Sequence, residues 1–254
     1  MHEGHRERIR EQYRNADIDT LQDYQVLELL LTYSIPRRDT NPIAHRLMEK
    51  YGSLGRIFAA DTAELMQNEG VGESTAAFLK LMGDVTRRTR LDATRDSAGA
   101  QVLTTPLASA RYASALLSLQ STETVWGACL DVHGKVLHAK QIVSGDISEA
   151  PVYPRQIVEY ALQQRAAAFL LMHNHPGGSP LPSQADGVST RAVKTALESI
   201  GIRLTDHLIT AEKYVYSFSK DRVIDTATGE VFSREAYGTP GSCKKHSLAV
   251  AEKE

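Results

Sequence analysis

The sequence predicts a small all-α domain followed by an α/β domain with a mixed sheet. Between about residues 20 and 90, apolar residues recur at helical spacing in short segments that glycine and proline separate. From residue 102 onwards, apolar runs typical of strands alternate with helical segments, which is the pattern of an α/β domain. A chain of 254 residues is long enough for two such units.

Composition and charge exclude several broad classes of protein. Apolar residues make up 42% and charged residues 24%, which is a globular balance and excludes disordered, collagen-like and coiled-coil chains. The formal net charge is −2, so no overall positive field favours nucleic acid. Cys129 and Cys243 cannot build a disulfide framework or a four-thiolate zinc site, so we expect a reducing compartment. Without a secretory signal or a long apolar run, we expect a cytoplasmic protein with no membrane contact.

Helices are predicted throughout residues 1–90. Residues 23–31 combine a capping aspartate with apolar side chains at helical spacing. Pro42 fits the first turn of a second helix, which we expect to end near Gly52. Further helices are expected at residues 53–58, 61–66 and 73–82.

A linker at residues 91–101 is predicted to precede the α/β domain at residues 102–224, because large apolar side chains are few there. Helices are expected at residues 107–119, 154–164 and 185–200. Strands are expected at residues 125–130, 136–143, 166–172, 203–210 and 214–218. The continuous apolar run at residues 166–172 indicates a strand that is buried on both faces. The remaining residues, 225–254, are predicted to be a poorly ordered tail.

The segment from His173 to Asp186 predicts a metal site. His173 and His175 are two residues apart at the end of the buried strand, so both imidazoles point to one side. A proline-rich loop leads to Ser183, a good N-cap, and Asp186 lies in the first helical turn. Taken one at a time, the two histidines are a common strand end, Ser183 is a helix cap, and Asp186 is a charge favoured by the helix dipole. Together they place two imidazoles and one carboxylate beside an apolar strand, which leaves a fourth position for water as in catalytic zinc sites.

These residues resemble the JAMM, or MPN-plus, metalloprotease motif. The chain reads His173-x-His175-Pro176, six residues, Ser183, two residues, Asp186. The flanking segments make residues 4 to about 222 similar to the RadC-type branch of that family, although Tyr-Pro-Arg-Gln replaces the usual His-Pro-Arg-Glu at residues 153–156. The resemblance implies a mixed-sheet α/β fold with layers like those of cytidine deaminases. The deaminase His-x-Glu and Pro-Cys-x-x-Cys segments are absent, which argues against deaminase chemistry.

The resemblance also implies a function. It implies a zinc-dependent hydrolase that cleaves a peptide or isopeptide amide in a protein or peptide substrate by means of a metal-activated water. In that enzyme His173, His175 and Asp186 would hold Zn²⁺, and Ser183 would donate a hydrogen bond to the oxyanion.

The resemblance further implies that Glu123 transfers protons from the attacking water to the leaving amine. Otherwise Glu123 is an exposed strand-entry residue, and Glu149 and Glu159 are weaker rivals for the role. Asp206 and His207 could support the ligands, but a strand histidine beside its own aspartate is more often a structural residue.

The turn at residues 70–72 resembles a helix-hairpin-helix, whose backbone amides meet a DNA phosphate. Glu69 and Glu73 flank the turn, and residues 1–95 carry 14 basic and 15 acidic side chains, so we expect weak DNA contact at most. Helical packing or protein contact is an equally good interpretation of this domain. The alternative function is therefore a DNA-associated accessory protein in repair or recombination, with a structural or idle zinc site. Hydrolysis that depends on Glu123 would separate the two functions.

Overall fold

A computed structural model describes residues 3–15, 18–120, 122–144, 154–176 and 178–238. The chain divides into two compact units, residues 1–89 and 90–254. Cys243 and the end of the predicted tail, residues 239–254, lie outside the described residues. Among the described helices, none combines the length and the apolar character that crossing a membrane requires.

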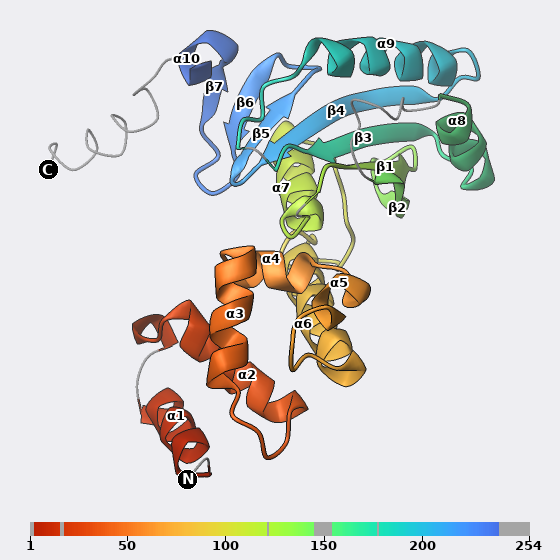
Figure 1. The fold of residues 1–254 in the computed structure, drawn as a ribbon. Helices are drawn as coiled ribbons and strands as arrows, with labels where there is room; N and C mark the ends of the chain where they lie inside the picture. Colours follow the sequence, from red (N-terminus) through yellow and green to blue (C-terminus); the bar gives the residue numbers. More distant parts are fainter. Residues whose placement is uncertain (1–2, 16–17, 121, 145–153, 177, 239–254) are drawn as a thin grey trace, which may run out of the picture. The chain divides into compact units, whose positions relative to one another are not determined.

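The first unit is helical, as the sequence predicts (Figure 1). Its helices are α1 (Glu3–Asn15), a short 3-10 helix (Ile18–Thr20), α2 (Asp23–Ser34), α3 (Asn41–Tyr51), α4 (Leu54–Ala59), α5 (Thr62–Met66) and α6 (Glu73–Asp92). Leu27, Leu47, Ile57 and Leu79 from four of these helices are fully buried in one apolar cluster. Helix α6 continues beyond the expected end at residue 82, and its last two residues, Leu91 and Asp92, fall in the predicted linker.

The second unit is built on one seven-stranded sheet. The strands are β1 (Thr124–Leu130), β2 (Val136–Ser144), β3 (Ala168–Asn174), β4 (Arg203–Ala211), β5 (Tyr214–Ser217), β6 (Arg222–Asp225) and β7 (Val231–Ser233). They lie in the order β2-β1-β3-β4-β5-β6-β7. The β3–β4 pair is parallel and the other neighbours are antiparallel, which confirms the predicted mixed sheet.

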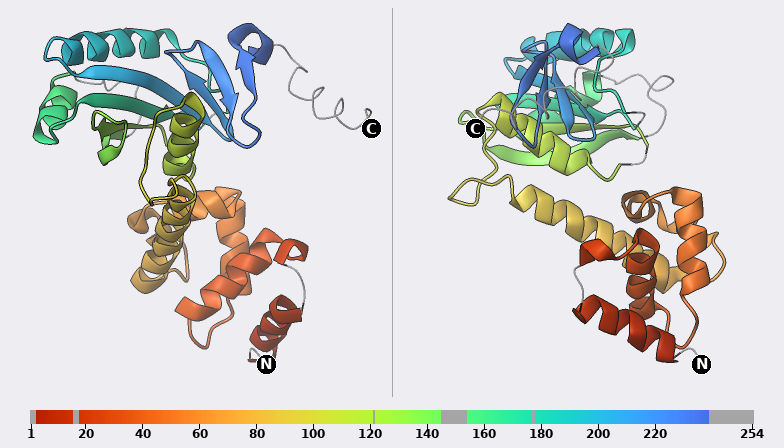
Figure 2. Two further views of the ribbon diagram at one scale, coloured as in Figure 1. Left: turned by 180° about the vertical axis from the view of Figure 1, so that it is seen from behind. Right: turned by 90° about the vertical axis from the view of Figure 1, so that its left-hand side faces the viewer.

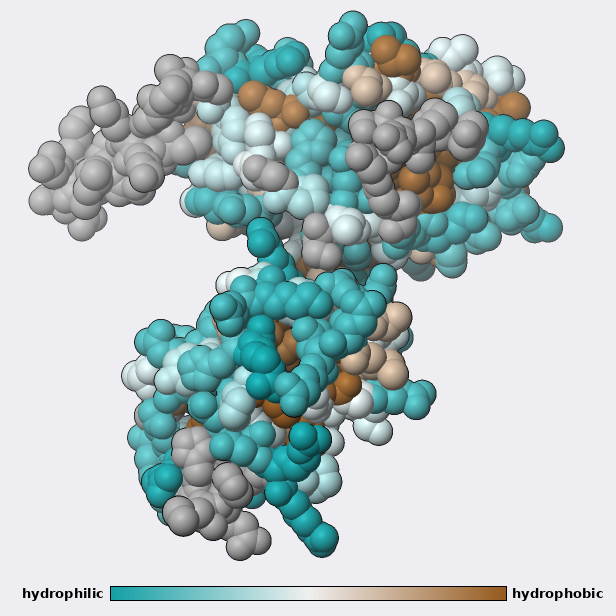
Figure 3. All heavy atoms as spheres, viewed as in Figure 1, coloured by the Kyte–Doolittle hydropathy of each residue, from teal (hydrophilic) through white to brown (hydrophobic). Residues whose placement is uncertain are grey.

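Helices cover both faces of this sheet (Figures 1 and 2). Helix α7 (Pro106–Leu117) packs on one face, where Leu170 and Met172 of β3 are buried. Helices α8 (Pro154–Gln163) and α9 (Gln184–Glu198) pack on the other face, where Phe169 and Leu171 are buried. Gly127 of β1 is required beneath Phe169, because any side chain there would collide with the ring. Strand β3 is therefore the centre of the core of the second unit. On the surface, hydrophilic residues cover most of the displayed face of each unit (Figure 3).

Two predicted boundaries are wrong, those of strand β3 and of the C-terminal tail. Strand β3 covers Ala168–Asn174 rather than residues 166–172, because the Ala166 N–H still bonds to the Ala161 carbonyl at the end of α8. His173 is consequently inside the strand and is held by neighbours on both sides. The predicted tail is ordered up to α10 (Arg234–Gly238), because β7 pairs with β6 and Phe232 packs on the apolar cluster around Tyr216.

Candidate metal centre

Strand β3 places His173 at the carboxyl end of its run, on the face that α9 covers. Phe169 and Leu171 precede it on that face and are fully buried. His173 continues the strand's period of two and is 2% exposed. His175 follows the strand, and its backbone N–H donates to the carbonyl oxygen of Thr210 at 2.8 Å. The sheet thus fixes the backbone on both sides of the two imidazoles.

The first turn of α9 supplies Asp186 through a capping box with Ser183. The Ser183 backbone N–H and hydroxyl donate to Asp186 Oδ2 at 2.7 and 2.6 Å. The other oxygen, Oδ1, faces His173 Nε2 at 3.3 Å. Burial opposes ionisation of Asp186, but its pKa lies below the usual value, in part because the Ser183 hydroxyl donates to it. Asp186 is therefore a buried carboxylate that faces both histidines.

Glu123 comes from a distant part of the chain, immediately before β1. Its Oε1 lies 3.9 Å from the Nε2 atoms of both His173 and His175. Asn174 holds this segment, because its Oδ1 accepts from the Thr124 N–H and hydroxyl, each at 2.9 Å. Its Nδ2 donates to the Thr122 carbonyl at 2.9 Å. The residue between the two histidines therefore fixes the chain on both sides of Glu123, a role that sequence reasoning missed.

Glu123, His173, His175 and Asp186 form a group whose potential ligand atoms all lie within 4.8 Å of one another. The structure therefore brings together the predicted metal ligands and the predicted proton-transfer residue. Glu159, a weaker rival, lies on α8 and pairs with Arg155 at 2.8 Å, outside this group. Glu149, the other rival, lies outside the described residues.

The atoms that converge in this group are hydrogen-bond acceptors. The Ser179 carbonyl oxygen lies 2.8 Å from His175 Nδ1, which must donate, so Nε2 of the neutral ring carries a lone pair. That Nε2 lies 2.9 Å from His173 Nε2. Burial favours neutral His175, but Asp186, the Ser179 carbonyl and Glu123 raise its pKa above the usual value. Two imidazole nitrogens and a carboxylate around such a point fit a divalent transition metal.

His207 of β4 lies behind the group and was not among the predicted site residues. Its Nε2 is 2.8 Å from His173 Nδ1, and its Nδ1 is 2.6 Å from the hydroxyl oxygen of Thr190 on α9. Burial lowers the pKa of His207 well below its usual value, so this ring is neutral. The sequence did not single out His207, because a strand histidine beside its own aspartate, here Asp206, is more often a structural residue.

Comparison with known proteins places this architecture in a family. A family model described as the RadC-like JAB domain matches residues 103–223, which contain all four residues of the group. UPF0758 proteins of Rhodobacter capsulatus and Ruegeria pomeroyi are 33% and 34% identical over 85% and 84% of this chain and 100% and 94% of their own lengths. A UPF0758 protein of Fusobacterium nucleatum is 31% identical over 87% of this chain and 97% of its own length. The chain belongs to the RadC-like JAB-domain family.

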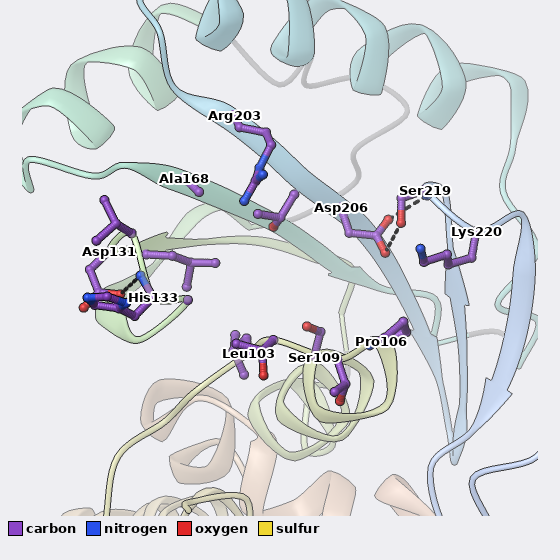
Figure 4. Close-up of a pocket in the computed structure, with 16 residues that line it drawn as sticks. Leu103, Pro106, Ser109, Asp131, His133, Ala168, Arg203, Asp206, Ser219 and Lys220 are labelled. Carbon is purple, nitrogen blue, oxygen red and sulfur yellow. Dashed lines mark hydrogen bonds between the residues drawn. The ribbon is translucent and has the colours of Figure 1, made fainter.

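The RadC-like domain also contains a cavity of about 640 Å³ away from the metal group (Figure 4). It opens near the amino ends of β3 and β4, at Ala168 and Arg203, beside the start of α7 at Pro106. None of the four residues of the metal group lines it. Its carboxylates, Asp131 and Asp206, accept hydrogen bonds from the surrounding backbone. The cavity and the group of potential metal ligands therefore lie in different places, and we take the candidate site from the ligand group rather than from the cavity.

Proposed function

We propose that this protein is a zinc-dependent hydrolase that cleaves a peptide or isopeptide amide in a protein or peptide substrate. The observation that carries the proposal is the convergence of Glu123, His173, His175 and Asp186 within 4.8 Å. Membership of the RadC-like JAB-domain family supports it, because the domain match covers the whole group.

In this proposal His173 and His175 hold zinc through Nε2, and Asp186 holds it through its carboxylate. When bound, zinc would polarise the scissile carbonyl and would lower the pKa of a bound water to near neutral pH. Glu123 is 3.9 Å from both histidine nitrogens and 29% exposed, so its carboxylate can reach water in the same space. It would take a proton from that water and deliver it to the leaving nitrogen.

Ser183 would stabilise the negative oxygen that develops on the substrate carbonyl. Its hydroxyl donates to Asp186 Oδ2 at 2.6 Å, so the hydroxyl must rotate before it can donate to a substrate. The Ser183 backbone N–H bonds to the same oxygen at 2.7 Å and does not depend on the side chain. Rotation of the hydroxyl would therefore leave Asp186 held in place.

The test compares new protein and peptide termini in cell extracts treated with the zinc-loaded wild type or with Glu123→Gln. The variant keeps the side-chain size and removes the base, so cleavage should slow by about 10²–10⁴-fold while the zinc content stays the same. Glu159→Gln is the matched control, because this glutamate pairs with Arg155 on α8 and should leave cleavage unchanged. Equal cleavage by wild type and Glu123→Gln would remove Glu123 from the mechanism.

The second candidate, a DNA-associated accessory protein, is favoured by the turn between α5 and α6. Gly70 has φ +89°, and the Val71 N–H donates to the Asn68 carbonyl at 3.0 Å, which makes a tight turn ahead of α6. Binding of the full chain to duplex DNA should be weak and should fall steeply with salt. Tight DNA binding that Glu123→Gln leaves unchanged, together with no wild-type cleavage, would favour this second candidate.

A further inference from the structure

His207 and Thr190 connect two of the proposed ligands through hydrogen bonds. His207 is 3% exposed, and its Nε2 lies 2.8 Å from His173 Nδ1, the ring nitrogen that points away from the metal group. His207 Nδ1 lies 2.6 Å from Thr190 Oγ1. Thr190 Oγ1 in turn lies 2.5 Å from the backbone carbonyl oxygen of Asp186. Three hydrogen bonds therefore run from the ring of His173 to the backbone of Asp186.

Chemistry fixes the direction of every proton in this chain. A carbonyl oxygen only accepts, so the single hydroxyl proton of Thr190 goes to Asp186. His207 Nδ1 must then donate to Thr190 Oγ1, which leaves a lone pair on His207 Nε2. That lone pair accepts from His173 Nδ1–H, so Nε2 of His173 carries the lone pair that faces the metal group.

We propose that His207 and Thr190 are positioning residues that lock His173 in the tautomer whose Nε2 is available to the metal. The inference rests on the metal site of the proposed function and adds two residues that lie outside the motif. Because the same chain ends on the Asp186 carbonyl, it also sets the position of α9 relative to the ring of His173. Partners at the outer nitrogen of a ligating histidine fix the ring and strengthen metal binding.

Packing is the competing explanation for His207. Its ring stacks on Phe218, with 4.9 Å between ring centroids and 5° between ring planes. A packing role requires a flat ring at this position, whereas the hydrogen-bond chain requires two nitrogens. His207→Phe keeps a flat ring and removes both nitrogens, so it separates the two roles.

The experiment measures the zinc dissociation constant of the full chain by competition with a chelator. Thr190→Val removes the hydroxyl at nearly constant volume and should weaken zinc binding by about 10- to 100-fold. Thr190→Ser restores the hydroxyl and should bind zinc like the wild type. His207→Phe should weaken zinc binding to a similar degree. Nitrogen NMR of the zinc-free chain should show His173 protonated at Nδ1 in the wild type and in Thr190→Ser, and a mixture of tautomers in Thr190→Val.

Two controls make the outcomes distinct. Thr205→Val on β4 removes a threonine hydrogen bond to the Phe169 carbonyl, away from the metal group, and should leave zinc affinity unchanged. His173→Ala removes a proposed ligand and should abolish tight binding. Wild-type affinity in His173→Ala would overturn the metal site itself. Loss of zinc in His173→Ala with wild-type affinity in both Thr190→Val and His207→Phe would overturn only the positioning role.

Discussion

Asp186 and Asp206 are carboxylates of the same unit, yet hydrogen-bond donors surround Asp206, whereas Asp186 also faces hydrogen-bond acceptors. Asp206 accepts hydrogen bonds from the Ser217 hydroxyl, from the Ser219 N–H and hydroxyl, and from the His207 N–H, at distances of 2.5 to 3.0 Å. Burial raises its pKa in spite of these donors. Asp186 has donors on Oδ2 only, and its Oδ1 faces a ring nitrogen that carries a lone pair.

The difference shows how a structural carboxylate is distinguished from a candidate ligand. Asp186 is buried and Asp206 is partly buried, and burial opposes the ionisation of both, so burial alone does not separate them. Asp206 is surrounded by hydrogen-bond donors, whereas Asp186 faces two imidazole nitrogens in a group whose composition fits a divalent metal. We therefore expect changes at the two positions to affect different measurable properties.

The largest expected effect is loss of the metal from His175→Ala. The purified wild type should carry about one zinc per chain, and the variant should lose most of it because one of three protein ligands is gone. Metal analysis by mass spectrometry measures the ratio, with Asp206→Asn as the matched control that keeps zinc. Equal zinc in the wild type and in a His173→Ala/His175→Ala double variant would rule out the metal centre.

Ser183→Ala should have the next largest effect, on turnover. Loss of one oxyanion donor typically slows reaction by about 10²–10³-fold, and kcat should fall with KM little changed. Zinc should stay, because the Ser183 backbone N–H still bonds to Asp186 Oδ2. Ser183→Thr retains the hydroxyl and is the control. If Ser183→Ala keeps its kcat but unfolds about 1 kcal/mol more easily, Ser183 serves only as a helix cap.

Asp206→Asn should affect stability and not metal binding. The amide cannot accept from all the donors that surround the carboxylate, so unfolding should become easier by about 1–3 kcal/mol. Urea denaturation of the zinc-free chain measures this change. A large loss of zinc affinity in this variant would contradict the separation between the two aspartates.

The smallest effect concerns a third carboxylate, Asp225, which is 2% exposed. Burial alone would raise its pKa, but Lys213 at 2.8 Å and the N–H groups of Ala227 and Thr228 hold the pKa below the usual value. Its stabilising effect is therefore present above the unfolded pKa of about 3.9 and is lost as the pH falls through the folded value.

Asp225→Asn should therefore destabilise the fold by about 1 kcal/mol at pH 7. The difference from the wild type should shrink steadily below about pH 4, as the wild-type carboxylate becomes protonated. Urea denaturation at several pH values measures this convergence. A difference that stays constant down to about pH 2 would show that the charge of Asp225 is unimportant.

The sequence by itself predicted the candidate ligand set and determined its local geometry. His173 and His175 share a side because a strand alternates, and Ser183 with Asp186 forms a capping box because helix starts have a fixed spacing. These relations span few residues, so local backbone geometry is sufficient to predict them. The mixed sheet and the helical first unit were also predictable, because both follow from hydrophobic periodicity.

The tertiary structure decided which distant residues meet the candidate ligands. Glu123 reaches the histidines because β1 lies beside β3 and Asn174 bonds to the chain on both sides of it. His207 reaches His173 because β4 is the other neighbour of β3, in parallel register. Strand order and register depend on the packing of the whole sheet, and no spacing within one segment encodes them. For that reason the motif predicted the candidate metal ligands, whereas only the folded chain revealed the residues that contact them.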